Sequence, residues 1–266
     1  MKYKLFIAGL IFTMIWACSR VPITKRNQTH LIPESQVISM SLTEYRNFLE
    51  KHPPVTSGSD EQMVKRVGSK IQAAVIQYMT QNGYKDRIDG YKWEFNLVNS
   101  KEVNAWCMPG GKVVIYSGIL PFTQTETGLA IVMGHEIGHA VAQHGNERMS
   151  QQLIAQGVGL GLDVYLSSKP AETHNLFMQA YGIGAEVGVL LPFSRLQESE
   201  ADKLGLVFSA LAGYDPREAI PFWQRMSKQG GNKPPEFLST HPSDDTRIKD
   251  LQKYMPQALK HYTGGK

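Results

Sequence analysis

The sequence predicts an α+β fold that is mostly helical and carries a small antiparallel sheet. Long segments repeat apolar residues every three or four positions, which is typical of helices with one buried face. A shorter segment, residues 93–116, instead alternates apolar with polar residues around a Pro-Gly-Gly reversal, which is typical of strands and hairpins. With 266 residues, 42% of them hydrophobic and 20% charged, the chain can form one domain with a substantial core.

The N-terminus, residues 1–17, is expected to be a lipoprotein signal peptide. Lys2 and Lys4 precede an apolar stretch, Leu5–Ala17, which is too short to span a membrane as an ordinary helix. Cys18 follows directly and resembles the lipidated cysteine of bacterial lipoproteins. Lipidation would attach the protein to a membrane through Cys18. A secretory signal cleaved nearby, or an uncleaved anchor, stays open as the alternative.

The next segment, residues 18–40, is polar and aperiodic and is expected to be a tether to a domain over residues 41–260. The first helix of that domain is predicted by apolar residues that recur every four positions: Met63, Val67, Ile71, Val75 and Met79. Helical patterns follow the predicted hairpin over Thr125–Gln143, Met149–Leu166, Ala171–Val187, Arg195–Leu211, Pro216–Lys228 and Asp244–Tyr254.

Charge and cysteine content argue against a nucleic-acid partner and a disulfide. The formal net charge is only +4, and the Lys and Arg residues are dispersed, so we expect no nucleic-acid partner. The one other cysteine, Cys107, has no disulfide partner if Cys18 carries lipid. We therefore expect Cys107 to be a small buried apolar residue.

The strongest motif is HExxH, from His135 to His139, within an apolar helical segment. Residues four apart lie about 6 Å apart along a helix and face the same side, so both imidazoles can bind one metal ion. Glu136 would reach the water that a zinc ion activates and would act as general base without binding the metal. The pattern indicates a hydrolytic zinc site.

A second acidic motif, from Glu198 to Asp202, supplies a third ligand. Catalytic zinc usually has three protein ligands and one water, and two His residues with one carboxylate form a known set. We therefore expect Glu198 to bind the metal. Asp202, one turn later, is expected to accept a hydrogen bond from the non-ligating ring nitrogen of a ligand His. Glu200 points to another side of the helix and is not expected to be a ligand.

These motifs combine with others along the chain: Asn104-Ala105-Trp106, Pro109-Gly110-Gly111, Pro192-Phe193-Ser194-Arg195, His241-Pro242 and Arg247. The combination resembles the zinc metallopeptidase family that contains the heat-shock protease HtpX, the periplasmic protease-chaperone BepA, the mitochondrial Oma-type protease and the CAAX prenyl protease. The resemblance covers about Asp60 to Leu251. It implies a zincin-like metallopeptidase domain with one Zn²⁺ per chain. Family members are sometimes described with a proton donor at the position of Asp202; we expect the orienting role.

The resemblance also implies a substrate class and a location. The expected enzyme is a zinc metalloendopeptidase that cleaves unfolded or extended segments of misfolded or stalled cell-envelope proteins. No apolar run beyond the signal is long enough to span a membrane, so the chain is similar to the soluble periplasmic branch. We expect it to be lipid-anchored in a bacterial cell envelope, at the outer rather than the inner membrane. The alternative is a chaperone-like outer-membrane assembly factor with latent or secondary protease activity.

Three further features have two interpretations each. The strand Asn104, Ala105, Trp106 is expected to bind extended substrate at a sheet edge, or else to be an ordinary strand with Trp106 in the core. In BepA-like relatives a His at the position of His241 approaches zinc and can block its open coordination site; a His-Pro pair is otherwise a cap or turn. His144, five residues after His139, falls on another helix face and is expected to be a surface or cap residue.

Overall fold

The computed structural model describes residues 18–157, 162–181, 194–228, 235–241 and 245–264. The expected signal peptide lies outside these ranges, as do Pro192, Phe193 and Pro242 of the motifs. The helices are α2 (Glu34–Lys51), α3 (Ser59–Gln81), α4 (Leu120–Thr123), α5 (Glu126–Val141), α6 (His144–Ala155), α7 (Leu162–Ser168), α8 (Pro170–Tyr181), α9 (Arg195–Leu211), α10 (Ala219–Ser227), α11 (Glu236–Thr240) and α12 (Asp245–Ala258). The strands are β1 (Cys18–Arg20), β2 (Asn27–Thr29), β3 (Glu94–Val98), β4 (Ala105–Met108) and β5 (Lys112–Tyr116).

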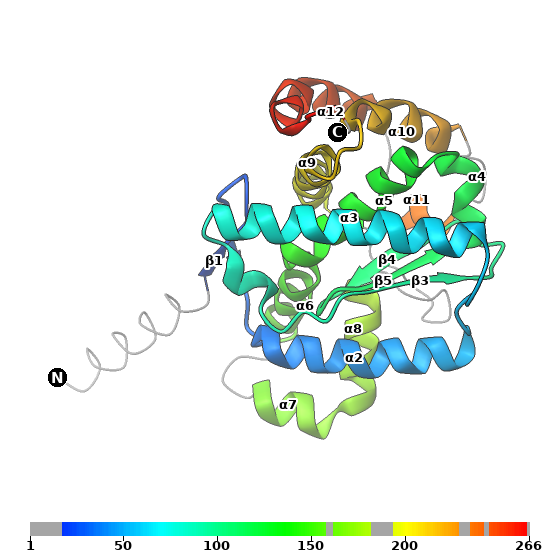
Figure 1. The fold of residues 1–266 in the computed structure, drawn as a ribbon. Coiled ribbons are helices and arrows are strands. Elements are labelled where there is room, and N and C mark those ends of the chain that lie inside the picture. Colours follow the sequence, from blue (N-terminus) through cyan, green and yellow to red (C-terminus); the bar gives the residue numbers. More distant parts are fainter. Residues whose placement is uncertain (1–17, 158–161, 182–193, 229–234, 242–244, 265–266) are drawn as a thin grey trace.

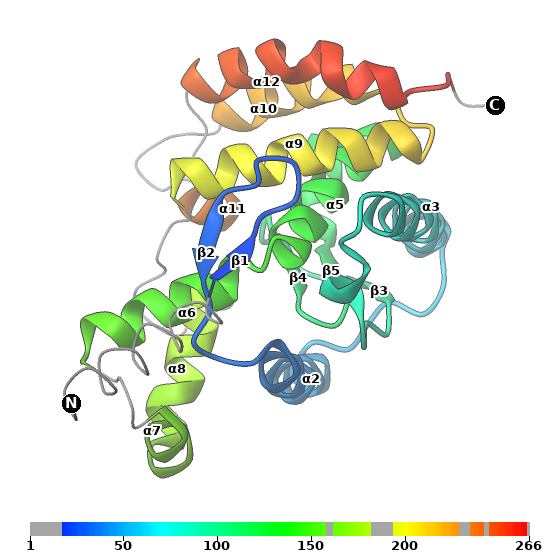
Figure 2. The same ribbon diagram turned by 90° about the vertical axis from the view of Figure 1, so that its left-hand side faces the viewer.

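A three-stranded sheet, in the order β3-β5-β4, lies between two helical layers (Figures 1 and 2). Alternate residues of β4 and β5 point to opposite faces, because side chains alternate along a strand. One face joins the main core with α3, α5 and α9, through Ala105, Cys107, Val113 and Ile115. The other joins a second core with α2, α6 and α8, through Trp106, Met108, Val114 and Tyr116. Both faces of the sheet are therefore buried.

The predicted α+β class is confirmed, with a difference in the sheet. β4 and β5 form the expected antiparallel hairpin, but β3 runs parallel to β5 and pairs Glu94 with Lys112. The sheet is therefore mixed. Two parallel neighbours require a crossover connection. Here the chain leaves β3 at one edge of the sheet, forms β4 at the opposite edge, and then forms the central strand β5.

The predicted helices are largely present. α3 contains the residues spaced by four, and Val67, Ile71, Val75 and Met79 of this set are fully buried. α9 spans the predicted range Arg195–Leu211. The pattern over residues 149–166, however, is divided between α6 and α7. Gly157 explains the break, because its φ of 71° is left-handed and ends the helical path just after α6.

The expected tether over residues 18–40 is wrong, because these residues are folded against the domain. β1 and β2 form an antiparallel hairpin, and α2 begins at Glu34. Val21 is fully buried and Ile32 is almost fully buried. Polar residues that suggested a solvated spacer are bonded to the domain, as when the Gln28 side-chain amide donates to the Ala142 carbonyl at 2.8 Å. The segment therefore belongs to the folded domain.

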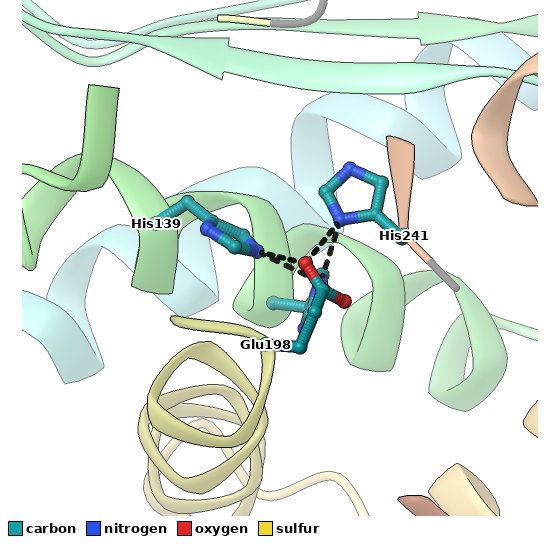
Figure 3. Close-up of side chains that lie close together, drawn as sticks. His139, Glu198 and His241 are labelled. Carbon is teal, nitrogen blue, oxygen red and sulfur yellow. Dashed lines mark hydrogen bonds and ion pairs between the residues drawn. The ribbon is translucent and has the colours of Figure 1, made fainter. Parts of the chain in front are cut away.

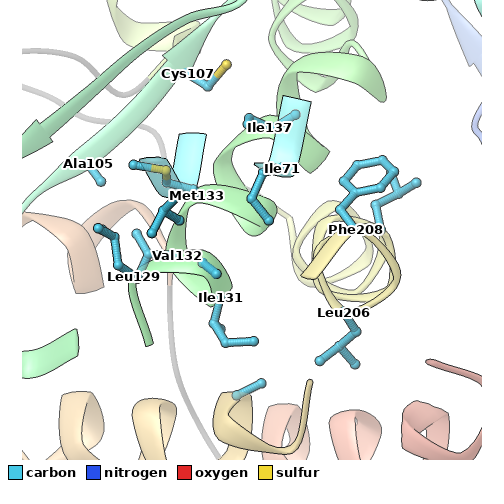
Figure 4. Packing of buried hydrophobic residues seen from close by; sticks show 14 of the residues in the cluster. Ile71, Ala105, Cys107, Leu129, Ile131, Val132, Met133, Ile137, Leu206 and Phe208 are labelled. Carbon is cyan, nitrogen blue, oxygen red and sulfur yellow. The ribbon is translucent and has the colours of Figure 1, made fainter. Parts of the chain in front are cut away.

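Two helices at the centre of the fold carry the chemical motifs, and each has a clear N-terminal cap. The Thr125 hydroxyl accepts a hydrogen bond from the Gly128 N–H at 3.1 Å and begins α5. Ser194 and Gln197 form a capping box that begins α9. Figure 4 shows Met133 and Ile137 of α5 within the main core, together with Ile71 of α3 and Phe208 of α9. The HExxH helix is thus buried on all sides.

α5 and α9 approach each other closely because glycines line their contact. A Cβ atom added at Gly205 would lie 2.8 Å from the backbone nitrogen of His135, and one added at Gly138 would lie 2.9 Å from the Ala201 oxygen. Real Cβ atoms essentially never come this close to backbone atoms. The glycines therefore determine how near the Glu198 helix lies to the two histidines.

Replacing Gly205 with Ala should destabilise the protein, by roughly 1–3 kcal/mol of unfolding free energy, because it overpacks this contact. In an ordinary helix the same change stabilises by about 1 kcal/mol, so the sign of the effect is informative. Denaturant unfolding measures it. The reverse exchange, Ala73→Gly, at an exposed position of α3 serves as control and should cost about 1 kcal/mol from helix propensity alone. A Gly205→Ala protein as stable as the parent would contradict the role of this contact.

Candidate metal centre

Four side chains from two helices and one helix end converge on a single point, and Figure 3 shows His139, Glu198 and His241 among them. They are His135 and His139 of α5, Glu198 of α9, and His241, which follows α11. All four are buried, and one potential ligand atom from each lies within 4.8 Å of the others. The structure thus brings together the two histidines and the glutamate that the sequence singles out, together with His241, for which the family resemblance left a position near zinc open.

The spacing of these atoms fits a tetrahedral metal ion. The Nε2 atoms of His135 and His139 are 3.1 Å apart, and the Nε2 of His139 is 3.1 Å from the Oε1 of Glu198. The Nδ1 of His241 lies 3.0 Å from the same oxygen and 3.2 Å from the Nε2 of His135. Ligands about 2.0 Å from a tetrahedral zinc ion are separated by roughly 3.3 Å, and two or three imidazoles with one carboxylate are a common zinc donor set. The residues present therefore fit zinc.

Burial and neighbouring groups favour the ligand forms of His139 and Glu198. Burial holds the pKa of His139 well below its ordinary value, so its imidazole is neutral and able to donate a lone pair. Burial by itself would raise the pKa of Glu198. The neighbouring His241, Arg247 and His135 outweigh that effect and hold the pKa of Glu198 well below its ordinary value. Glu198 is therefore a carboxylate.

Glu136 lies beside the cluster without belonging to it. Its side chain is 4% exposed, and its Oε1 lies 3.5 Å from the Nε2 of His241. Burial raises the pKa of Glu136 to about 7, which is suitable for a group that accepts and returns a proton near neutral pH. Glu136 thus lies where a general base could act next to the corner of the cluster that His241 occupies.

Asp202 contacts the outer nitrogen of a candidate ligand. Its Oδ1 lies 2.9 Å from the Nδ1 of His135, whose Nε2 faces the cluster. This is the position that the sequence predicts for Asp202. A carboxylate here favours the tautomer of His135 in which Nδ1 carries the proton and Nε2 is free to bind metal.

Arg247 of α12 links two acidic residues of the site, a role that sequence reasoning did not assign. Its Nη1 is 2.7 Å from the Oε2 of Glu198, while its Nη2 is 2.7 Å from the Oδ1 of Asp202. The guanidinium carbon also lies 3.3 Å from the centre of the Trp223 ring. Arg247 belongs to the motif combination, but nothing near it in sequence indicates which acids it meets.

His144 was expected at the surface or as a helix cap, and the surface interpretation is wrong. His144 begins α6 and is fully buried. Its Nδ1 lies 2.9 Å from the Nδ1 of His139, and its Nε2 lies 3.1 Å from the Oε2 of Glu200. The prediction assumed one continuous helix, whereas α5 ends at Val141 and Gln143, with φ of 58°, turns the chain back. Glu200 is outside the cluster, as expected, but it is buried.

The strand proposed for substrate binding lies at the edge of the sheet in the described part of the chain. Asn104, Ala105 and Trp106 are all buried, at 2%, 2% and 3% exposure. Trp106 packs with Tyr45 and Phe48 in the second core, the alternative that the sequence left open. The Asn104 Oδ1 accepts from the Ala105 N–H at 2.9 Å, while its buried Nδ2 has no hydrogen-bond partner among the described residues.

The two cysteines lie apart from the metal centre. Cys107 is a free, buried thiol in the main core, as the sequence predicts, and burial raises its pKa well above the ordinary value. Cys18 is the first residue of β1 and pairs with Thr29, and its lipidation stays a prediction. None of the helices in the described residues is both long enough and apolar enough to cross a membrane.

The chain is similar to two groups of curated proteins. It is 34% identical over 202 residues to the mitochondrial metalloendopeptidase OMA1 of Saccharomyces cerevisiae, covering 71% of this chain and 56% of that protein. It is 30% identical over 275 residues to the mitochondrial metalloendopeptidase OMA1 of Homo sapiens, covering 97% of this chain and 51% of that protein. A beta-barrel assembly-enhancing protease of Yersinia pestis is 32% identical over 176 residues, covering 64% of this chain and 36% of that protein. The chain thus spans about half the length of the OMA1 relatives.

These similarities overturn the expected location in a bacterial envelope at the outer membrane. The OMA1 relatives from yeast, plant and mammal carry mitochondrial names. These three relatives match 71%, 77% and 97% of the chain, whereas the bacterial relatives match 64% and 60% of it. The expectation combined a short N-terminal pattern with a resemblance to the periplasmic branch of the family, and both are weaker support than similarity over most of the chain. A bacterial outer-membrane location is therefore not supported.

The sequence profile of Peptidase family M48 matches residues 65–255. This range contains the HExxH helix, the acidic motif of α9, His241 and Arg247. It covers most of the described domain, including every residue of the candidate metal centre. The chain belongs to peptidase family M48.

Proposed function

We propose that this chain is a zinc-dependent endopeptidase that cleaves extended segments of misfolded or stalled proteins. The observation that carries the proposal is the buried cluster of His135, His139 and Glu198, with Glu136 beside it. Family membership and relatives named as metalloendopeptidases support the reaction class. The choice of misfolded or stalled substrates comes from the family resemblance.

Each residue of the site has a distinct proposed role. His135, His139 and Glu198 would hold the zinc ion, which when bound supplies a Lewis acid and makes water a nucleophile near neutral pH. Glu136 accepts the proton of the attacking water and later delivers a proton to the leaving amine, as a base becomes an acid in the second half of the reaction. Asp202, held by Arg247, orients His135 through its Nδ1.

His241 is proposed to be a latency switch. Its Nδ1 lies within 3.2 Å of both Glu198 Oε1 and His135 Nε2, which is the corner where a catalytic zinc keeps an open position. His241 is the C-cap residue of the short helix α11. A side chain at this corner competes with water and substrate, so withdrawal of His241 would open the site.

Substrate is proposed to bind along the edge strand β4. An edge strand can pair with an extended peptide through backbone hydrogen bonds, which depend little on the peptide's side chains. The buried Nδ2 of Asn104 has no partner among the described residues, which supports this, because such a donor is costly and a peptide carbonyl would satisfy it. Trp106 is not included, since it is part of the second core.

Changing Glu136 to Gln should abolish hydrolysis and leave zinc bound, because Gln cannot accept the proton while the three ligands remain. Degradation of casein and metal analysis of the purified protein measure the two effects. A chelator should abolish casein degradation by the parent protein, and Glu172→Gln on the exposed face of α8 serves as the control with normal activity. Normal turnover by the Glu136→Gln protein would refute the assignment.

Changing His241 to Ala should increase casein degradation severalfold while zinc remains at one ion per chain. The reason is that the substitution vacates a metal corner without removing His135, His139 or Glu198. Paired assays of zinc content and initial rate make the measurement. A drop in zinc content would instead identify His241 as a required ligand and would refute the latency role.

Changing Asn104 to Ala should raise the KM for a peptide substrate more than it lowers kcat, by roughly fivefold to tenfold for one lost hydrogen bond. The change removes the donor that is proposed to meet the peptide. Steady-state kinetics on a fluorogenic peptide give both constants. Zinc content should be normal, since Asn104 does not contact the cluster. An unchanged KM would argue against this part of the strand as the substrate site.

A further inference from the structure

A chain of hydrogen bonds connects the N-terminal hairpin, residues 18–29, to the metal centre. Thr24 donates from its hydroxyl to the Oε1 of Glu200 at 2.6 Å. The Arg26 guanidinium donates to both oxygens of Glu200, at 3.0 and 2.9 Å. Glu200 contacts His144 at 3.1 Å, and His144 contacts His139 at 2.9 Å. Three successive contacts, from Arg26 to Glu200, from Glu200 to His144 and from His144 to His139, thus lead from a segment far away in sequence to a candidate zinc ligand.

The tautomers along this chain are determined at both ends. The Nε2 of His139 faces the cluster, so it must be unprotonated to bind metal and Nδ1 must carry the proton. That proton is donated to the Nδ1 of His144, whose Nε2 then carries a proton and donates it to Glu200. Glu200 can accept it because Arg26 stabilises the carboxylate. Every donor therefore meets an acceptor.

The two histidines of the HExxH motif have parallel support. His135 is held by Asp202, and Asp202 is paired with Arg247 from α12. His139 is held through His144 by Glu200, and Glu200 is paired with Arg26 from the hairpin. Both carboxylates come from α9, where Glu200 and Asp202 are two residues apart. The arginines, in contrast, come from opposite ends of the chain.

The turn of the hairpin is strained, and Glu200 is one of the groups that hold it. Ile23 and Lys25 have φ of 67° and 56°, and a left-handed conformation is unfavourable for a β-branched residue such as Ile23. Thr24 and Arg26, the residues that follow each of them, both bond to Glu200. Such strain persists only where surrounding contacts require it. Here the contacts are those that lead to His139.

We propose that Arg26 is a positioning residue and that Arg26, Glu200 and His144 orient His139 for metal binding. The proposal rests on the proposed zinc function. It assigns the N-terminal hairpin a role in the metal centre that acts through Glu200 and His144. Loss of the Arg26 contact would weaken zinc binding without removing a ligand.

Glu147 provides the matched control, because it shares the hairpin contact but not the path to His139. Arg26 donates to Glu147 as well, with its Nη2 at 2.8 Å from Oε2. The same carboxylate also accepts from Gln197 at 2.9 Å and from Gln28 at 3.2 Å. Glu147→Gln therefore weakens hairpin docking and leaves Glu200 and His144 in place. If the hairpin is only a structural clamp, Glu147 and Glu200 should be equivalent.

The experiment compares the full chain with three variants, Glu200→Gln, Arg26→Gln and Glu147→Gln. Zn²⁺ affinity is measured by competition with a chromophoric chelator, and the visible spectrum of the Co²⁺-loaded protein reports ligand geometry. Thermal melting of each variant shows whether it is folded. We expect Glu200→Gln and Arg26→Gln to weaken Zn²⁺ binding by about tenfold and to shift the Co²⁺ bands, as loss of a group behind a ligand does. Glu147→Gln should lower the melting temperature alone.

The outcomes separate the two proposals. A parent protein that fails to bind Zn²⁺ overturns the proposed function and this inference with it. A parent that binds Zn²⁺ tightly while Glu200→Gln and Arg26→Gln bind it equally well overturns the inference alone. Equal weakening by Glu147→Gln and Arg26→Gln also overturns it, because the hairpin would then act only as a clamp. If Glu200→Gln does not fold, the comparison of Arg26→Gln with Glu147→Gln decides.

Discussion

The close approach of α5 and α9 is the constraint on which the rest of the structure depends. Gly134, Gly138 and Gly205 remove side chains from the contact, so that backbone meets backbone. Only at this separation can a carboxylate of α9 reach imidazoles that project from α5. The same contact buries the HExxH helix in the main core, where packing holds side chains in single conformations. Core packing and the geometry of the candidate metal centre are therefore determined by one interface.

Burial of so many ionisable groups would be costly without partners. Glu198, Glu200 and Asp202 are 4%, 1% and 7% exposed and occupy one turn and a half of α9. Arg247 binds two of them, Glu198 and Asp202. Arg26 binds the third, Glu200, together with Glu147. A buried carboxylate remains charged only when such partners offset its desolvation. The two arginines thus keep in the charged form the acids that the metal centre requires.

Much of the fold and of the candidate ligand set could be predicted from local patterns. The four-residue spacing in α3, the motif of α5 and the range of α9 depend on helical periodicity, which a short window of sequence contains. Long-range pairing could not be predicted in this way. The parallel neighbour of β5, the docking of residues 18–40 and the partners of Arg247 depend on where distant segments meet. His144 was misjudged because a single left-handed residue, Gln143, breaks the helical phase.

X-ray absorption at the zinc edge of the purified full-length chain would test the central claim most directly. The account predicts one zinc ion per chain, with only nitrogen and oxygen ligands at about 2.0 to 2.1 Å and the outer-shell scattering of at least two imidazoles. Absence of bound zinc, or a sulfur ligand at about 2.3 Å, would contradict it.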